Sequence, residues 1–364
     1  MDSKISLGMW QLFSMFLIML LLPLCGVWIA GKELMAFLEF PPLTQYVEHA
    51  GFAWIVFVAM ATFVLVVVTP LLTKVVLSST KQKDSPGVSF PLWGWGTIIL
   101  CLVSWLLAWT RFGWFSDYQI FTFSPLWFAF IGIVNAFTFA RSGRCMLLNR
   151  PKYLIRLFIV SALFWWTFEY LNRFVQNWYY VGIEDLSPGK YVLFATLSFS
   201  TVLPAVLGTC ELLETFPCFS AGLHEYKKIN TKYPKATAML FLMFAAVGLF
   251  GIGIFPNYLY PLLWISPLFI ISSIQVFAGV ETIFTPLRQG NWSRIFLLAV
   301  SSLICGFFWE MWNCFSYAKW IYSIPFVETL HIFEMPLLGY AGYLSFGLEC
   351  GVIADLCTLK TDHV

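Results

Sequence analysis

The most conspicuous deficit in this sequence is charge. Aspartate, glutamate, lysine and arginine make up only 11% of the 364 residues, against about 25% in an ordinary soluble domain. Hydrophobic residues make up 60%, and apolar runs of about eighteen or more residues recur along the chain, each long enough to cross the hydrocarbon layer as a helix. The sequence therefore excludes a water-soluble domain and predicts an all-α integral membrane protein.

The chain also lacks the short motifs of common enzymes and metal proteins. Its nine cysteines include no Cys-x-x-Cys pair, and no phosphate-binding loop, nucleophile elbow or dinucleotide fingerprint is present. His331 and Glu334 would share a face of a helix, but no second cluster completes a metal site. The net charge of +2 is too small to indicate nucleic acid. We expect no metal, no cofactor and no nucleic acid. The expected partners are the lipid of the surrounding membrane and, as a ligand, a small solute or a lipid.

Ten apolar segments predict about ten transmembrane helices. The first segment follows Lys4 and has no small-x-small cleavage site, so we interpret it as a retained anchor rather than a signal peptide. The connectors are too short to hold a separate soluble domain. The predicted spans are residues 8–30, 51–73, 91–110, 124–141, 153–171, 191–211, 237–256, 264–284, 294–313 and 332–354.

The basic residues predict the orientation of these spans. Lysine and arginine near helix ends are retained on the cytoplasmic side. With the N-terminus inside, sixteen of the 21 Lys and Arg residues fall in inner loops, and the other five, Lys32, Arg111, Arg173, Lys190 and Lys319, fall in outer loops. We therefore expect both termini in the cytoplasm, and the cytoplasmic membrane as the location in a bacterium.

The sequence contains an internal repeat. Three patterns recur in one order and at nearly one offset: Ser124-Pro125-Leu126 with Ser266-Pro267-Leu268, Glu169-x-x-Asn172 with Glu310-x-x-Asn313, and aromatic segments that begin at Trp178 and Trp320. We interpret residues 90–215 and 237–356 as two copies of a four-helix unit, preceded by two helices in residues 1–80. Since four spans is an even number, the copies should be parallel and related by a two-fold axis along the membrane normal.

Polar residues inside the predicted spans are the candidate site residues. An ionised side chain at the centre of a spanning helix costs about 2.5–3.5 kcal/mol. Glu169 and Asn172 share one helical face, as do Glu310 and Asn313. These four residues, with the aromatic side chains of Trp178 and Trp320, are our candidate substrate-binding residues, and Glu211 and Glu349 are secondary candidates. The alternative for each carboxylate is a helix-end position from which it reaches water.

The two copies differ in charge beside their candidate carboxylates. Arg173 follows Glu169 by one helical turn, so we expect it to neutralise that carboxylate. Cys314 follows Glu310 at the same spacing and offers no cation. The sequence assigns no catalytic residue.

Three functions agree with these patterns. The first is a carrier or solute-handling protein with a site between the two repeats, which the parallel duplication favours. The second is a membrane-embedded enzyme that acts on a lipid or an isoprenoid. The third is a non-catalytic membrane subunit of a larger complex. A cavity that reaches the membrane midplane would favour the carrier, and a solid bundle would favour the subunit.

Overall fold

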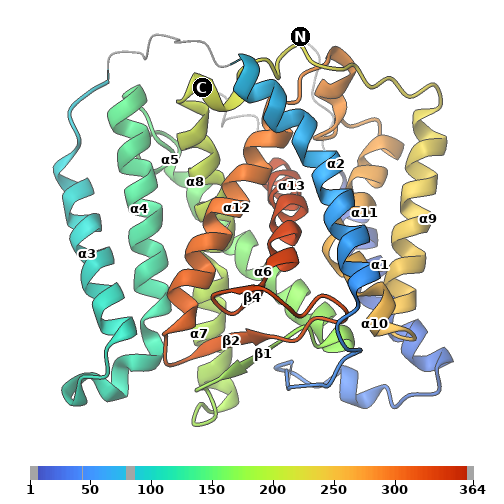
Figure 1. The fold of residues 1–364 in the computed structure, drawn as a ribbon, viewed down its shortest axis with the longest axis horizontal. Helices are drawn as coiled ribbons and strands as arrows, with labels where there is room; N and C mark the ends of the chain where they lie inside the picture. Colours follow the sequence, from blue (N-terminus) through green and yellow to red (C-terminus); the bar gives the residue numbers. More distant parts are fainter. Residues whose placement is uncertain (1–6, 43, 79–86, 359–364) are drawn as a thin grey trace.

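The protein is a polytopic helical bundle. A computed structural model describes residues 7–42, 44–78 and 87–358; Lys4, Lys81, Lys83 and Lys360, which contribute to the predicted orientation, lie outside these ranges. Within the described ranges, nine helices are long and apolar enough to cross a membrane, and the number is ten if one bent pair counts as a single span. The first helix begins and the last helix ends at the same end of the bundle (Figure 1).

Eight predicted spans correspond to single helices, although the last begins later than expected. These helices are α1 (Met9–Ile29), α2 (Trp54–Ser78), α3 (Leu92–Trp109), α4 (Phe123–Ser142), α6 (Pro151–Val175), α9 (Pro234–Ile252), α12 (Ser293–Cys314) and α13 (Tyr340–Leu356). Proline at the first position of α6 and α9 removes an N–H that would have no partner in the helix. Gly143 ends α4 in the left-handed conformation that glycine adopts without strain.

The predicted span 191–211 is a broken helix. It consists of α7 (Pro188–Phe199) and α8 (Val202–Glu214). Ser161 of α6 satisfies the backbone groups at the break, because its hydroxyl donates to the Phe199 carbonyl at 2.6 Å and accepts from the Leu203 N–H at 3.0 Å. Such replacement of lost helical hydrogen bonds is what permits a break within the membrane.

The predicted span 264–284 also differs in the structure. The helical residues are α10 (Pro256–Leu259), η4 (Tyr260–Trp264) and α11 (Ser266–Phe277), and the chain bends by 51° between η4 and α11. Pro267 lies at the start of α11, where its ring and its missing N–H prevent η4 from continuing as a straight helix.

The segment before α13 departs from the expected helix. Residues 331–339 form two short strands, β3 (His331–Ile332) and β4 (Met335–Pro336), and a turn of 3₁₀-helix, η6 (Leu337–Gly339). The expectation that His331 and Glu334 share a helical face is therefore wrong. His331 instead pairs with Glu328 at 2.8 Å.

Helices α8, α12 and α13 pack together in the middle of the bundle, and α6 packs against α8. On either side of this centre, α3 packs against α4 and α9 packs against α11 (Figure 1).

The two N-terminal helices differ in how they contact the rest of the bundle. Helix α1 lies close to α9, where Gly26 meets the backbone of Phe250 and Gly253. Helix α2 has no buried residue.

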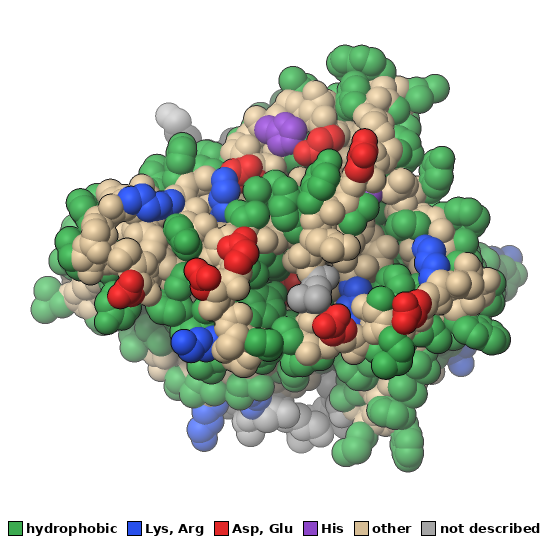
Figure 2. All heavy atoms as spheres, turned by 90° about the horizontal axis from the view of Figure 1, so that it is seen from below, with side chains coloured by type: hydrophobic (Ala, Val, Ile, Leu, Met, Phe, Trp, Pro, Cys, Tyr) green, Lys and Arg blue, Asp and Glu red, His purple; other side chains and the backbone are tan. Residues whose placement is uncertain are grey.

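A two-stranded ribbon joins segments far apart in the sequence. Strand β1 (Trp178–Val181) follows α6, strand β2 (Lys319–Tyr322) follows α12, and the two pair antiparallel. The ribbon lies at the end of the bundle opposite the start of α1 (Figure 1). On that face, charged side chains are scattered over the central part, and hydrophobic side chains fill much of the rim (Figure 2).

Candidate functional site

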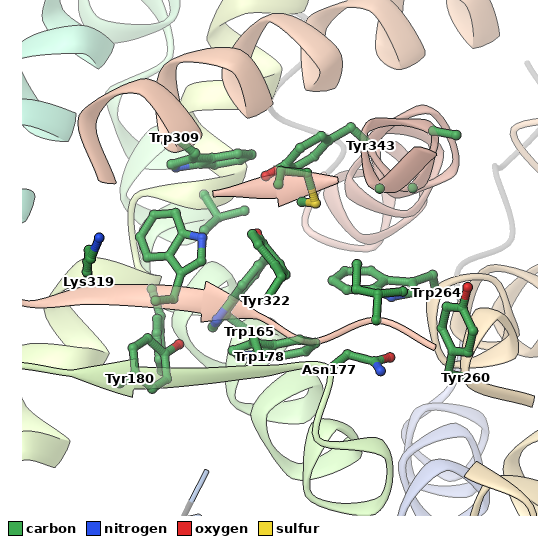
Figure 3. Close-up of a pocket in the computed structure, with 18 of the residues that line it drawn as sticks. Trp165, Asn177, Trp178, Tyr180, Tyr260, Trp264, Trp309, Lys319, Tyr322 and Tyr343 are labelled. Atoms are coloured by element: carbon green, nitrogen blue, oxygen red, sulfur yellow. The ribbon is translucent and has the colours of Figure 1, made fainter. Parts of the chain in front are cut away.

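A cavity of about 610 Å³ lies beside the β1/β2 ribbon. Residues of α2, α6, α7, η4, α12 and α13 and of the ribbon line it, so both halves of the chain contribute. Its walls are mainly apolar and strongly aromatic (Figure 3). The aromatic lining residues include Trp165, Trp178, Tyr180, Trp264, Trp309, Trp320, Tyr322 and Tyr343.

Glu169 is buried directly behind this wall. Its side chain has no exposed surface, and it does not line the cavity. One carboxylate oxygen, Oε1, accepts three hydrogen bonds, from Trp165 Nε1 at 3.1 Å, Trp178 Nε1 at 3.1 Å and Tyr180 Oη at 2.6 Å. All three donors line the cavity, so Glu169 fixes the orientation of part of its wall.

Glu310 has the same relation to the wall in the second half. It is fully buried, and its Oε1 accepts from Tyr322 Oη at 2.9 Å and Tyr343 Oη at 2.6 Å. Both tyrosines line the cavity. The residue one turn before Glu310 is Gly306, whereas the residue one turn before Glu169 is Trp165. The ring of Tyr343 occupies the space beside Gly306, where a Cβ would overlap it.

The tyrosines of the ribbon remain hydrogen-bond donors over the physiological range. Burial and, second, the neighbouring Glu169 carboxylate raise the pKa of Tyr180 well above its usual value. Burial and then Glu310 do the same to the pKa of Tyr322. Because an ionised phenolate beside a buried carboxylate is unfavourable, each hydroxyl keeps its proton and donates a hydrogen bond to the carboxylate.

Asn172 and Asn313 bind the backbone of the ribbon. The Nδ2 of Asn172 donates to the Trp178 carbonyl at 2.8 Å, and its Oδ1 accepts from the Asn177 N–H at 2.8 Å. The Nδ2 of Asn313 donates to the Trp320 carbonyl at 2.8 Å, and its Oδ1 accepts from the Trp320 N–H at 2.9 Å. Each asparagine therefore attaches the strand that follows its own helix, and neither lines the cavity.

The structure thus places the six candidate residues at or directly behind the wall of one cavity. Trp178 and Trp320 line the cavity. Glu169, Glu310, Asn172 and Asn313 support the wall from behind. Each carboxylate retains one buried oxygen, Oε2, without a hydrogen-bond partner among the described residues.

The two secondary candidates lie away from the cavity lining. Glu211 forms a salt bridge with Arg150 at 3.0 Å and accepts from the Met146 N–H at 3.2 Å. Glu349 is fully buried in α13, and neither of its carboxylate oxygens has a hydrogen-bond partner within the described part of the chain. The two residues therefore differ in environment.

The cation expected beside Glu169 points elsewhere. Arg173 donates to the carbonyl groups of Phe37 and Glu39, in the connector between α1 and α2. Helical spacing alone suggested a pair with Glu169, but two backbone carbonyl groups of this connector accept hydrogen bonds from the guanidinium instead. In the second half, Lys319 lines the cavity and pairs with Glu334.

Sequence reasoning missed the residues that complete the wall. Trp165 precedes Glu169 by one turn, a spacing that could have indicated contact. Tyr180 and Tyr322 belong to the recurring aromatic segments, but their hydrogen bonds to the carboxylates depend on the chain reversal after each helix. Tyr343 is 33 residues from Glu310, and no local pattern joins them.

Comparisons with protein-family models, with curated proteins and with solved structures found no match. The fold and its long apolar helices define the class as a polytopic helical membrane protein.

Proposed function

We propose that this protein is a carrier-type, solute-handling membrane protein whose solute is an amphipathic molecule of the lipid or isoprenoid class. The observation that carries the proposal is the aromatic cavity between residues of the two halves. Its volume of about 610 Å³ falls in the range of about 300–1,000 Å³ that is typical of small-molecule sites. A solid bundle without such a space would have favoured the alternative of a non-catalytic subunit.

The chemistry of the wall supports an apolar or amphipathic ligand. Most lining side chains are aromatic or aliphatic, so the apolar part of a ligand that leaves the lipid finds an equally apolar environment there. Tyr180, Tyr322 and Tyr343 direct their hydroxyl groups to Glu169 and Glu310. Their polar groups are thus already engaged, and their rings remain for contact with a ligand.

The pairing of the ribbon supports the duplication on which the carrier proposal rests. Trp178 lies opposite Tyr322, and Tyr180 lies opposite Trp320. At the centre, Tyr179 lies opposite Ile321, its own equivalent in the second aromatic segment. A two-fold axis that relates two parallel repeats and passes through the ribbon would produce this register, and parallel repeats are an arrangement found among transporters.

A photolabelling experiment tests ligand binding in the cavity. Gly342 lines the cavity, and a Cβ there would meet open space, so Gly342→Leu should fill the site without a clash. Gly96 of α3 is exposed, also has open space at its Cβ and does not line the cavity, which makes Gly96→Leu the matched control. The probe is a long-chain fatty acid with a mid-chain diazirine in phosphatidylcholine and phosphatidylglycerol vesicles.

We expect the wild-type protein and the Gly96→Leu variant to be labelled on cavity residues such as Trp264. The Gly342→Leu variant should lose about tenfold of this labelling, which corresponds to about 1.4 kcal/mol. Labelling confined to the outer surface of the bundle, or equal labelling of the cavity in all three proteins, would contradict the proposal.

A further inference from the structure

Helix α2 forms one side of the cavity. Ala59, Met60, Phe63 and Val64 line it, and their spacing places them on one helical face. Phe63 is nevertheless 70% exposed, so the same side chain contacts both the cavity and the surroundings of the bundle. Since α2 is an apolar helix long enough to span the membrane, those surroundings are lipid. The cavity therefore borders the bilayer at α2.

The middle of α2 is held more weakly than its ends. Just before the helix, the Ala53 N–H donates to the Phe326 carbonyl at 2.9 Å, and the Phe326 N–H donates to the Ala50 carbonyl at 3.1 Å. Near its other end, Ser78 lies against Gly222. Between these attachments the helix buries no residue, whereas α1 buries four. Moving the middle of α2 away from the bundle therefore breaks few packing contacts.

We infer that α2 covers a lateral opening, and that the ligand is a long-chain amphiphile that reaches the cavity from the bilayer by passing this helix. The inference rests on the proposed function and adds the route and the shape of the ligand. The α2 side of the cavity is wholly apolar, as an acyl or isoprenoid chain requires. Among the polar lining residues, Ser198 and Ser345 lie on α7 and α13, whereas the amide of Asn177 and the ammonium group of Lys319 lie at the ribbon. The headgroup binds at the ribbon, where the only lysine or arginine among the described lining residues lies.

A crosslink between α2 and the body of the protein tests the route. Met60 and Leu338 both line the cavity, and α2 contacts η6, which contains Leu338. Met60→Cys and Leu338→Cys are introduced together after Cys25, Cys218 and Cys314, the three cysteines that are not buried, are replaced by serine. A short bismaleimide then joins the pair. The Met60→Cys protein treated with the same reagent is the control.

The readout is the rate at which the diazirine fatty acid from vesicles labels the cavity. Crosslinking before exposure to the probe should slow labelling by about tenfold or more, and crosslinking after loading should slow release by a similar factor. The control protein should load and release as before. Unchanged uptake and release in the crosslinked protein, with labelling of the cavity intact, would overturn the α2 route and leave the proposed function standing.

A variant without a crosslink tests the same route in the opposite direction. Phe63→Ala removes the side chain that spans the boundary between cavity and lipid, and exchange of the probe should become several-fold faster. An unchanged exchange rate would overturn the inference even if the crosslinked protein could not be recovered in folded form. Absence of cavity labelling in every protein, including the wild type, would overturn the proposed function and the α2 route together.

Discussion

The hydroxyl group of Tyr343 reaches Glu310 because Gly306, one helical turn before Glu310, has no side chain. In the first half, Trp165 stands one turn before Glu169 and donates to it from the same helix. Glu169 thus accepts a hydrogen bond from its own helix, α6, whereas Glu310 of α12 accepts the corresponding hydrogen bond from the neighbouring helix α13. The two halves reach the same result, a carboxylate that holds aromatic wall residues, with different residues.

The contact between Gly306 and Tyr343 predicts the effect of one methyl group. Gly306→Ala places a Cβ in the volume of the Tyr343 ring, so we expect a loss of about 1–3 kcal/mol from overpacking and a lower midpoint of thermal unfolding in detergent. Gly342→Ala is the control on the facing helix, because its Cβ meets open space. It should be neutral or stabilising, since alanine is a better helix former than glycine. Equal effects of the two substitutions would contradict the proposed packing.

The carboxylates predict a distinction between leucine and glutamine. Glu169→Leu leaves three donors without their acceptor and Glu310→Leu leaves two, at about 1–3 kcal/mol for each donor that stays buried. Glutamine keeps an acceptor oxygen in the same place. We therefore expect Glu169→Gln and Glu310→Gln to retain the fold and the labelling of the cavity, measured by thermal unfolding and by the diazirine probe.

The glutamine variants also separate binding from chemistry. If the carboxylates only support the wall, both variants should keep transfer of a fluorescent fatty acid across vesicles close to the wild-type rate. Full folding and binding with complete loss of transfer would instead require a proton or a charge at one of these positions. That outcome would contradict a purely supporting role.

The two asparagines predict a local loosening of the ribbon. Asn172→Ala or Asn313→Ala removes both a donor and an acceptor for the strand backbone. At about 1 kcal/mol for each of the two hydrogen bonds lost, amide hydrogen exchange in the strand that follows the substituted helix, residues 178–181 or 319–322, should become about thirtyfold faster. Asn149→Ala is the control, because Asn149 accepts from the Cys145 N–H just before α5 (Met146–Asn149). If that control loosens the ribbon equally, the effect is not local.

The predicted orientation is open to a labelling test on intact cells. Lys190 and Lys228 are both exposed, and the excess of basic residues in the predicted inner loops places Lys228 in the cytoplasm and Lys190 outside. With Cys25, Cys218 and Cys314, the three cysteines that are not buried, replaced by serine, Lys190→Cys should react with a membrane-impermeant maleimide. Lys228→Cys should react only after the cells are opened. The reverse pattern would invert the orientation of the whole bundle.

The sequence was sufficient to locate most helices because apolar length is a local property. The predicted span 294–313 and the helix α12, Ser293–Cys314, differ by one residue at each end. The breaks in α7/α8 and before α11 were not predicted, since a broken span is as apolar as a straight one. The break after Phe199 depends on Ser161, a hydrogen-bonding residue 38 positions earlier in the chain.

The sequence indicated which buried polar residues lie beside the cavity, but not their geometry. Buried carboxylates and asparagines could be found because they are costly in lipid. Their role as supports depends on strands β1 and β2, which are only four residues long and have no periodic pattern to detect. The cavity itself requires the positions of helices that are remote in sequence, and α2 gave no sign that it would border it.

The ribbon has a mechanical consequence because it joins two segments that lie far apart in the chain. Strand β1 belongs to the first half and β2 to the second, and each is fastened to its own helix by an asparagine. A displacement of α6 relative to α12 that preserves these hydrogen bonds is smallest at the ribbon. Such a displacement would be larger at the opposite end of the bundle, where α1 begins and α13 ends, and there it would have to rearrange the contacts of α8 with α12 and α13.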